Sequence, residues 1–367
     1  MASRLLEVKS ALQDSVDRLV LDLLPGGKRS GGNYTVKSPV RHDRRAGSFV
    51  VWLTGPAKGC FKDYADDSAK GDIIDLIALC KGMGKDRSAA LAWAEDWLGW
   101  KKMSKADRAK YIKEIKKREK LEKAKDDRRQ QYLIQQAQKT WNKTLPIEGS
   151  LGEVYFKHRG IPLDEIRNRT DFCHFLPEAE YWLLADYEFE GGKRKKVKAG
   201  PTFPAIVSRM DNIDGHLQAL HYTFIAPDGC GKAPIEDQSK AKLMFPRTAG
   251  AAIWMTRGKG NLNPDTMVAR KLAAPGVIGE GIEDGLSVAL GVPEARVLAA
   301  GSLPNLLTFP LHPCFNSFVL LKDNDWNKPE AQALFDRAFQ RVKRAGYPVE
   351  VVSSNCGKDM NDLLGGV

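Results

Sequence analysis

The sequence predicts a multidomain protein of mixed α/β and α+β class, and three observations lead to this prediction. The chain has 367 residues, which is enough for two or three domains that each have a core of their own. Over residues 271–367, strand-like and helix-like runs alternate with short turns between them, and this pattern predicts a parallel sheet with helices on both faces. Residues 1–100 and 146–270 instead mix short strands with short helices.

The C-terminal domain has the most regular pattern. Its apolar runs of a few residues have the length of buried strands, and its longer runs have a helical period. The predicted strands are 276–279, 295–299, 317–321 and 349–352. The predicted helices are 282–290, 303–307 and 329–344.

The two preceding modules are predicted from shorter signals. In the first, a helix over residues 5–24 is followed by short strands and further helices. In the second, residues 203–209 and 216–225 form a hairpin, and the Lys and Arg residues at 193–198 form a basic loop. That loop either touches phosphates or is a solvated tip.

A basic helical connector is predicted over residues 101–145. Between residues 101 and 130 there are 14 Lys or Arg against 6 Asp or Glu, with neither Gly nor Pro. This composition predicts a long exposed helix, which either contacts a polyanion or is simply solvated. The predicted parts of the chain are therefore 1–100, 101–145, 146–270 and 271–367.

Composition narrows the classes of protein to consider. Lys and Arg total 57 and Asp and Glu total 46, so the formal net charge of +11 favours a polyanionic partner without proving one. No C-x-x-C pair occurs among the six cysteines, which excludes an intact zinc ribbon or a thioredoxin-type motif. The chain has no apolar run of about 18 residues. We therefore expect a cytoplasmic protein in a reducing compartment, without membrane contact.

Acidic residues follow three of the four predicted C-terminal strands. Glu280 follows the first strand, Asp323 and Asp325 follow the third, and Asp359 comes a few residues after the fourth. The carboxyl ends of parallel strands meet at one edge of a sheet, so we expect these carboxylates to lie together. Gathered carboxylates repel one another unless a cation neutralises them, and their oxygens suit Mg²⁺ or Mn²⁺.

A carboxylate cluster with a divalent ion is typical of phosphoryl or nucleotidyl transfer and of phosphodiester cleavage. Lys322 and Lys358 lie among the acids and could balance phosphate charge. The alternative is that each Asp only caps a helix or forms a turn. Glu280 is the hardest to explain in that way, because it is flanked by two glycines at the end of a strand.

The segments VIGEGIEDGLSVAL, LLKDND and GKDMNDLL resemble the Toprim domain, which bacterial-type primases, topoisomerases and some nucleases share. The resemblance covers roughly residues 275–367 and implies a divalent-metal site made of the acids that match the family's motif. The implied catalytic and metal-binding residues are Glu280, Asp323 and Asp325, with Asp284 and Asp359 as further metal ligands.

The preceding module resembles the subdomain that precedes Toprim in such primases. Residues 203–225 look like its strand-turn-strand, and YFKHRGI at 155–161 is similar to its Y-L-x-x-R-G-I. Lys242 stands where that family often has a basic, nucleotide-facing segment. The resemblance therefore implies that Lys242, Lys322 and Lys358 bind nucleotide.

Residues 38–49 and 59–77 are similar to the zinc-ribbon module of the same primases, with most metal ligands replaced. Ser38 stands where the first cysteine belongs, and only His42 and Cys60 remain, so zinc is not expected. We expect the ribbon shape to persist without metal, held by Phe49, Val51, Trp52, Phe61 and Tyr64. The residues expected to contact single-stranded DNA are Arg41, Arg44, Arg45 and Lys62.

These resemblances imply a DNA primase of phage or mobile-element type. Such an enzyme makes short RNA primers from ribonucleoside triphosphates on single-stranded DNA, and it works with a replicative helicase that is fused or separate. One alternative is a Toprim nuclease that uses the same ions with water as the nucleophile. Another is a non-catalytic module that coats single-stranded DNA, which the degraded ribbon favours.

Overall fold

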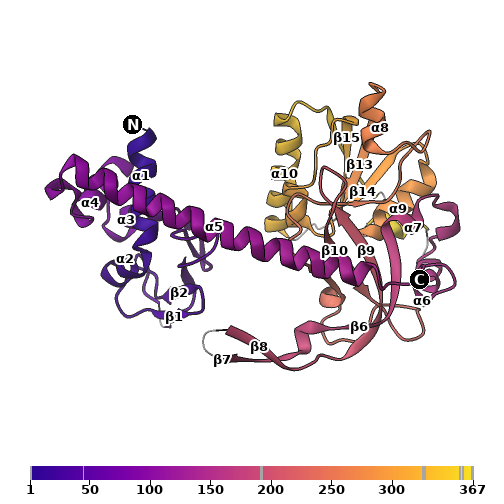
Figure 1. Cartoon of the computed structure of the whole chain (residues 1–367), viewed down its shortest axis with the longest axis horizontal. Helices are drawn as coiled ribbons and strands as arrows, with labels where there is room; N and C mark the ends of the chain where they lie inside the picture. The colour runs from indigo at the N-terminus through magenta and orange to yellow at the C-terminus, as the bar shows by residue number, and fades with distance from the viewer. Residues whose placement is uncertain are drawn as a thin grey trace. The chain divides into compact units, whose positions relative to one another are not determined.

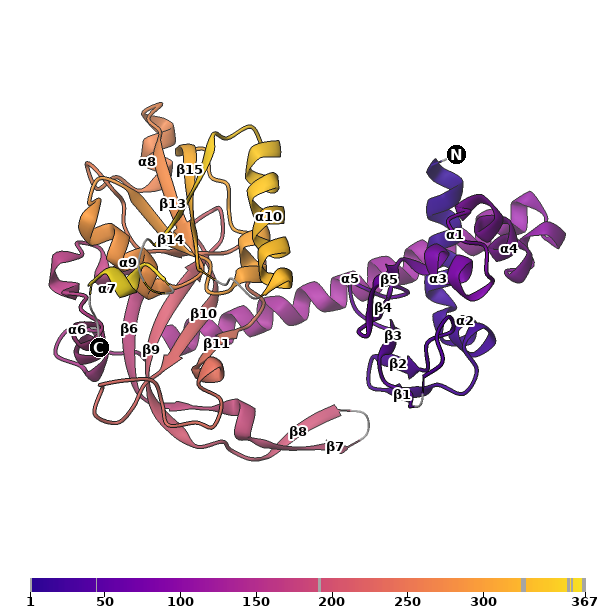
Figure 2. The ribbon, with the colours of Figure 1, turned by 180° about the vertical axis from the view of Figure 1, so that it is seen from behind.

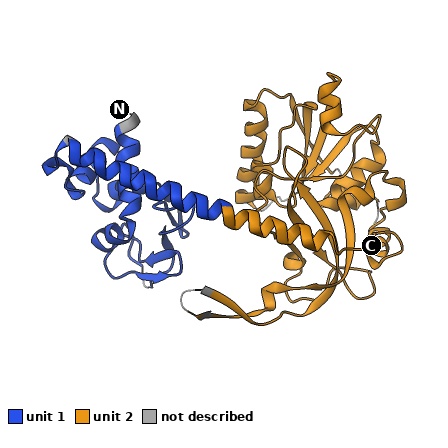
Figure 3. Ribbon diagram, viewed as in Figure 1, with its two compact units in different colours: residues 1–127 blue, residues 128–367 orange. Residues whose placement is uncertain are grey.

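The chain forms two compact units, residues 1–127 and 128–367 (Figure 3). The computed structural model describes residues 2–43, 45–190, 193–324, 328–354, 357 and 359–364. The boundary between the units lies inside one long helix, α5 (Lys105–Trp141). The predicted basic helix therefore exists and belongs in part to each unit.

The N-terminal unit packs helices against an antiparallel sheet (Figure 1). The strands run in the order β1 (Lys28–Ser30), β2 (Asn33–Val36), β3 (Phe49–Trp52), β4 (Phe61–Asp63) and β5 (Asp66–Gly71). The helices are α1 (Ala2–Asp14), α2 (Val16–Leu23), α3 (Ile73–Cys80), α4 (Arg87–Trp97) and the short η1 (Trp100–Lys102). The predicted helix over residues 5–24 is thus two helices that meet at Ser15.

The ribbon core is smaller than the sequence indicated. Phe49 and Phe61 are buried and stack with their ring centroids 5.3 Å apart. Tyr64 is 63% exposed, so the expectation that it holds the ribbon together is wrong. It follows the last residue of β4, and its ring lies instead beside the Lys62 ammonium, 4.9 Å from the ring centroid.

The first half of the second unit is a four-stranded antiparallel sheet with short helices (Figure 2). Its strands, in spatial order, are β11 (Lys242–Phe245), β10 (Leu217–Phe224), β9 (Thr202–Asp211) and β6 (Cys173–Glu180). The accompanying helices are α6 (Leu151–His158), η2 (Leu163–Glu165), α7 (Arg169–Phe172), η3 (Trp182–Leu184) and η4 (Gln238–Ala241). The predicted hairpin of residues 203–225 is therefore the β9–β10 pair.

The basic segment at 193–198 is a strand and not a loop. β8 (Lys193–Lys198) pairs with β7 (Asp186–Glu190) in a separate two-stranded sheet. Acidic and basic residues stand opposite each other across the pair, as Glu188 does with Lys195. Opposite charges on neighbouring strands stabilise such a pair. Tyr187 and Phe189 alternate with acids along β7, whereas β8 is almost entirely basic and lacks the apolar alternation by which strands are recognised.

The C-terminal half of this unit is a five-stranded sheet. In spatial order its strands are β12 (Ile253–Trp254), β14 (Arg296–Ala299), β13 (Ala274–Gly279), β15 (Phe315–Lys322) and β16 (Val349–Ser353). Its helices are α8 (Pro264–Ala269), α9 (Ile282–Gly291), η5 (Leu303–Leu307), α10 (Pro329–Arg344) and η6 (Asn361–Leu364). The four predicted strands are parallel to their neighbours, and β12 joins the edge antiparallel.

Helices cover both faces of this sheet, as the sequence predicts. On one face, Val277 and Val297 share a core with Leu286 of α9. On the other, Ile278 and its neighbours share a core with Phe335 of α10. Successive strand residues face opposite sides, so the buried parallel strands read as continuous apolar runs. The predicted fold class is confirmed.

Within the part of the chain that the structure describes, no helix is both long enough and apolar enough to cross a bilayer.

Candidate active site

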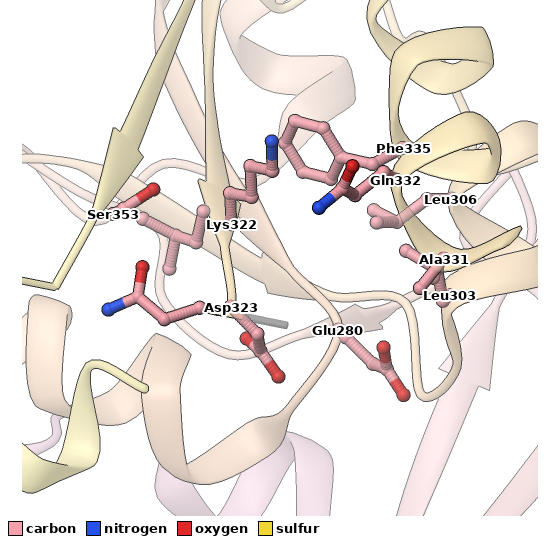
Figure 4. A pocket seen from close by; sticks show the side chains of 11 residues that line it. Glu280, Leu303, Leu306, Lys322, Asp323, Ala331, Gln332, Phe335 and Ser353 are labelled. Atoms are coloured by element: carbon pink, nitrogen blue, oxygen red, sulfur yellow. The ribbon is translucent and has the colours of Figure 1, made fainter. Parts of the chain in front are cut away.

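Two of the predicted acids lie at neighbouring strand ends. β13 ends at Gly279 and is followed by Glu280, and β15 ends at Lys322 and is followed by Asp323. These strands are adjacent and parallel, so the two acids emerge at the same edge of the sheet. Both line a cavity of about 90 Å³. In Figure 4 their carboxylates extend to the same side, away from the Lys322 amine.

The loop that carries Asp359 is fixed to helix α9. Asp284 Oδ1 accepts hydrogen bonds from the backbone amides of Met360 at 3.0 Å and Asn361 at 3.3 Å. The Asn361 side chain donates to Ser287 Oγ at 3.1 Å. These contacts bring the C-terminal loop, which follows the fourth parallel strand, to the helix that follows the first.

The carboxylates near this loop repel one another. Burial, followed by the charges of Asp359, Asp323 and Glu283, raises the pKa of Asp284 to about 7. In addition, Asp359 Oδ1 is buried and has no hydrogen-bond donor among the described residues. We call Glu280, Asp284, Asp323 and Asp359 the acid cluster. Asp325, the other predicted ligand, lies outside the described residues.

The donor set of the acid cluster suits a divalent cation. Its atoms are carboxylate oxygens, the ligands that Mg²⁺ and Mn²⁺ prefer. The raised pKa of Asp284 and the unsatisfied Asp359 oxygen are what a missing positive charge would produce. No three His, Cys, Asp or Glu side chains converge closely enough to hold an ion in the described ranges, which omit Asp325.

The negative charge of Glu283, next to Asp284, is balanced by a cation inside the protein. Its carboxylate accepts a hydrogen bond from Lys242 Nζ at 2.8 Å and from Tyr155 Oη at 2.9 Å. Burial alone would raise the pKa of Glu283, but the Lys242 ammonium lowers it to about 2. The pair also raises the pKa of Lys242 despite its burial, and burial beside Glu283 raises that of Tyr155.

The predicted nucleotide-binding lysines occupy different environments. Lys242 forms an ion pair with Glu283, so its ammonium is already engaged. Lys322 lines the same cavity as Glu280 and Asp323, and its Nζ lies 5.4 Å from the centre of the Phe335 ring. Lys358 lies outside the described residues.

In the N-terminal unit, the positions that resemble metal ligands are joined by hydrogen bonds and ion pairs. Arg41 Nε donates to Asp43 at 2.8 Å, and Arg41 Nη2 lies 3.2 Å from Asp63, whose side chain is fully buried. Asp43 also accepts from the Ser38 amide at 2.9 Å. Hydrogen bonding to Arg41 lowers the pKa of Asp43 to about 2. We call Ser38, Arg41, Asp43 and Asp63 the Arg41 cluster.

The residues expected to contact DNA in this unit lie in different surroundings. Arg41 holds the ribbon together through Asp43 and Asp63, so it is not a free surface cation. Arg45 is exposed and Lys62 is half-buried on β4, while Arg44 lies outside the described residues. Sequence reasoning missed both this cluster and the Lys242–Glu283 pair, because the paired residues are 22 and 41 positions apart.

Two family models match parts of the chain. Residues 276–366 match the family model of the Toprim domain, and residues 131–255 match that of a domain of unknown function, DUF7146. The C-terminal part of the chain, residues 276–366, is therefore a Toprim domain. No curated protein sequence matches the chain.

Solved structures that resemble the chain include several primases. The zinc-binding and RNA polymerase domains of the Aquifex aeolicus primase align over 98% of this chain and 82% of theirs, at 16% identity and a TM-score of 0.36. The RNA polymerase domain of the Mycobacterium tuberculosis primase aligns over 64% of this chain and 78% of its own, at 12% identity and a TM-score of 0.37. The primase fragment of the bacteriophage T7 primase-helicase protein aligns over 45% of this chain and 60% of its own, at 16% identity and a TM-score of 0.29.

Proposed function

We propose that the chain is a DNA primase that synthesises short RNA primers on single-stranded DNA by divalent-metal-dependent nucleotidyl transfer. The observation that carries the proposal is the acid cluster of the Toprim domain. Glu280 and Asp323 line one cavity at adjacent strand ends, and Asp284 links helix α9 to the loop of Asp359. Carboxylates that raise a neighbour's pKa toward 7 are suited to a cation-dependent reaction on phosphates.

In this proposal the acid cluster, together with Asp325, would hold Mg²⁺ or Mn²⁺. Bound there, the ions would lower the pKa of the attacking 3′-hydroxyl and neutralise the leaving pyrophosphate. Asp284 positions the Asp359 loop by accepting hydrogen bonds from the backbone amides of Met360 and Asn361. Lys322 and Lys358 would contact the triphosphate. Lys242 has another role, because its ion pair with Glu283 keeps that carboxylate ionised and separate from the acid cluster.

The partners of the proposed reaction are single-stranded DNA and ribonucleoside triphosphates. Arg44, Arg45 and Lys62 would contact template phosphates. One of the similar structures is a primase catalytic domain bound to single-stranded DNA, and another comes from the bacteriophage T7 primase-helicase protein. We propose a helicase partner, fused or separate, a phage or mobile-element origin, and action in the cytoplasm.

A primer-synthesis assay tests the proposal. Labelled ribonucleoside triphosphates, single-stranded DNA and Mg²⁺ or Mn²⁺ are incubated with the wild type, Glu280→Gln and Asp323→Asn. We expect each variant to lose about 100-fold or more of the activity, since a bound ion supplies several kcal/mol of charge stabilisation. Asp336→Asn is the matched control, because Asp336 is an exposed acid on α10 of the same domain.

The same assay separates the alternatives. Template cleavage that disappears in both variants would indicate a Toprim nuclease and overturn the primase proposal. Single-stranded DNA binding that both variants retain, with no product from the wild type, would indicate a non-catalytic binding module.

A further inference from the structure

A second, larger cavity lies in the same unit, at the opposite edge of the Toprim sheet from the acid cluster. It has a volume of about 550 Å³, within the range of cavities that bind small molecules. Its wall includes Arg296, the first residue of β14, which pairs in register with Gly276 of β13. Gly276 lies three residues, or about 10 Å, before Gly279, the last residue of β13, which precedes Glu280. The two cavities share no lining residue.

Three arginines line this cavity, and two of them have carboxylate partners. Arg209 Nη2 lies 2.8 Å from Asp211, and Arg257 Nη2 lies 2.8 Å from Asp171. Arg296 is the exception: it is 1% exposed, and the described residues provide it with no ion pair.

Arg296 is incompletely satisfied by the protein. Its Nη2 donates to the Leu262 carbonyl, and its Nη1 has no acceptor among the described residues. Burial lowers its pKa. A buried cation without an anion costs stability, which a bound anionic ligand would recover. A second lining residue, Trp254, also has a buried donor, Nε1, with no acceptor among the described residues.

The remaining wall is partly aromatic and partly polar, and it includes two further aspartates, Asp214 and Asp265. Trp141 and His174 stack with centroids 4.0 Å apart, and the Arg209 guanidinium carbon lies 5.7 Å from the centre of the Trp141 ring. Trp254 stacks on Phe315 at 5.7 Å. Flat aromatic faces beside arginine are the surfaces on which nucleic-acid bases stack. A simple anion would use only the Arg296 end of the cavity.

We propose that this cavity binds a nucleotide, with its phosphate at Arg296 and Trp254 Nε1 and its base against the aromatic wall. The site differs from the acid cluster in position and in chemistry, because three arginines and several aromatic rings line it together with aspartates, two of which are paired with Arg209 and Arg257. It therefore needs no divalent ion, and it can be tested independently of primer synthesis.

Calorimetric titration of the full chain with adenosine 5′-diphosphate in EDTA tests the proposal. We expect one saturable site, and Arg296→Gln weakens it by about tenfold or more. The matched control is Arg341→Gln. Arg341 also donates to a carbonyl, that of Phe309 at 2.7 Å, and has a buried Nη1 without an acceptor in the described part, but it lies on α10 and does not line the cavity. Arg341→Gln is expected to bind like the wild type.

A second variant guards against misfolding of Arg296→Gln. Trp254→Phe keeps an aromatic side chain, though a smaller one, and removes the Nε1 donor, and it is expected to weaken binding about three- to tenfold. Inorganic phosphate and adenosine serve as separate competitors, and each is expected to bind more weakly than the diphosphate.

Several results would overturn the proposal. These are no saturable binding by the wild type, equal weakening in Arg341→Gln, or phosphate that binds as tightly as the nucleotide. Binding lost in Asp323→Asn would place the ligand at the acid cluster instead. None of these outcomes depends on whether the chain makes primers, since the titration contains neither metal nor template.

Discussion

The Arg41 cluster and the acid cluster use the same side-chain chemistry in opposite ways. In the N-terminal unit, the Arg41 guanidinium lies beside both Asp43 and the buried Asp63, so each carboxylate has a cation next to it, although Asp63 Oδ2 has no hydrogen-bond donor among the described residues. In the Toprim domain, the neighbours of Asp284 are largely other carboxylates, and its pKa rises to about 7. A charge group that is balanced internally supports the fold. One that is left with excess charge of a single sign is suited to a ligand of opposite charge.

Glu283 shows how local this difference is. It is adjacent to Asp284 on α9, yet Lys242 holds its pKa at about 2. One lysine on β11 therefore determines which of two neighbouring acids is balanced inside the protein.

The largest expected effect comes from breaking this balanced pair. Lys242→Met leaves the buried Glu283 without its cation, which we expect to cost about 3–5 kcal/mol of unfolding free energy. Urea unfolding at pH 7 measures the loss. Lys240→Met is the control, because Lys240 is 61% exposed and its pairing with Asp237 at the surface contributes little. Equal midpoints for the two variants would contradict the role of Lys242.

Substitution of Asp284 is expected to raise the free energy of unfolding, the opposite of the effect of Lys242→Met. Because the pKa of this carboxyl is higher in the folded state, its effect on stability is absent below pH 4 and becomes fully unfavourable as the pH rises past about 7. Asp284→Asn keeps an oxygen for the two loop amides. At pH 8 in EDTA it should raise the unfolding free energy by roughly 2 kcal/mol, with no gain at pH 4.

With Mg²⁺ in place of EDTA at pH 8, the wild type should become more stable than Asp284→Asn, because the ion stabilises the wild type more. A variant that is less stable than the wild type at pH 8 in EDTA would show that Asp284 is not under repulsion.

A smaller effect is expected at the Arg41 cluster. Arg41→Gln removes the cation that faces the buried Asp63, so the ribbon should open more often. We expect amide hydrogens of β3 and β4 to exchange about tenfold faster, and those of the Toprim sheet to remain unchanged. Arg45→Gln, at an exposed position of the same segment, is the control. Unchanged exchange in Arg41→Gln would mean that the cluster does not hold the ribbon.

The smallest effect concerns the hydroxyl that supports Glu283. Tyr155→Phe removes one hydrogen bond at 2.9 Å and should cost about 1 kcal/mol in urea unfolding. Tyr132→Phe is the comparison, since Tyr132 is 59% exposed on α5. A loss as large as that of Lys242→Met would show that the tyrosine, and not the lysine, is the main support.

The Toprim strands could be predicted from the sequence because buried parallel strands are continuous apolar runs. β8 could not, since it is almost entirely basic and its pairing with β7 relies on cross-strand charge, and neither could β12, which has only two residues. The strand-end positions of Glu280 and Asp323 followed from local motifs. Their surroundings depend on partners distant in the chain, such as Lys242 for Glu283 and the Met360 amide for Asp284, and no local pattern reports those contacts.

The most direct test of the central claim, that acids from separate strand ends together bind a divalent cation, is a Mn²⁺ titration. The wild type, Asp323→Asn and the control Asp336→Asn are titrated without nucleotide, and free Mn²⁺ is followed by electron paramagnetic resonance. We expect saturable binding in the wild type and the control, weakened about tenfold or more in Asp323→Asn. Equal affinity in all three proteins would contradict the claim.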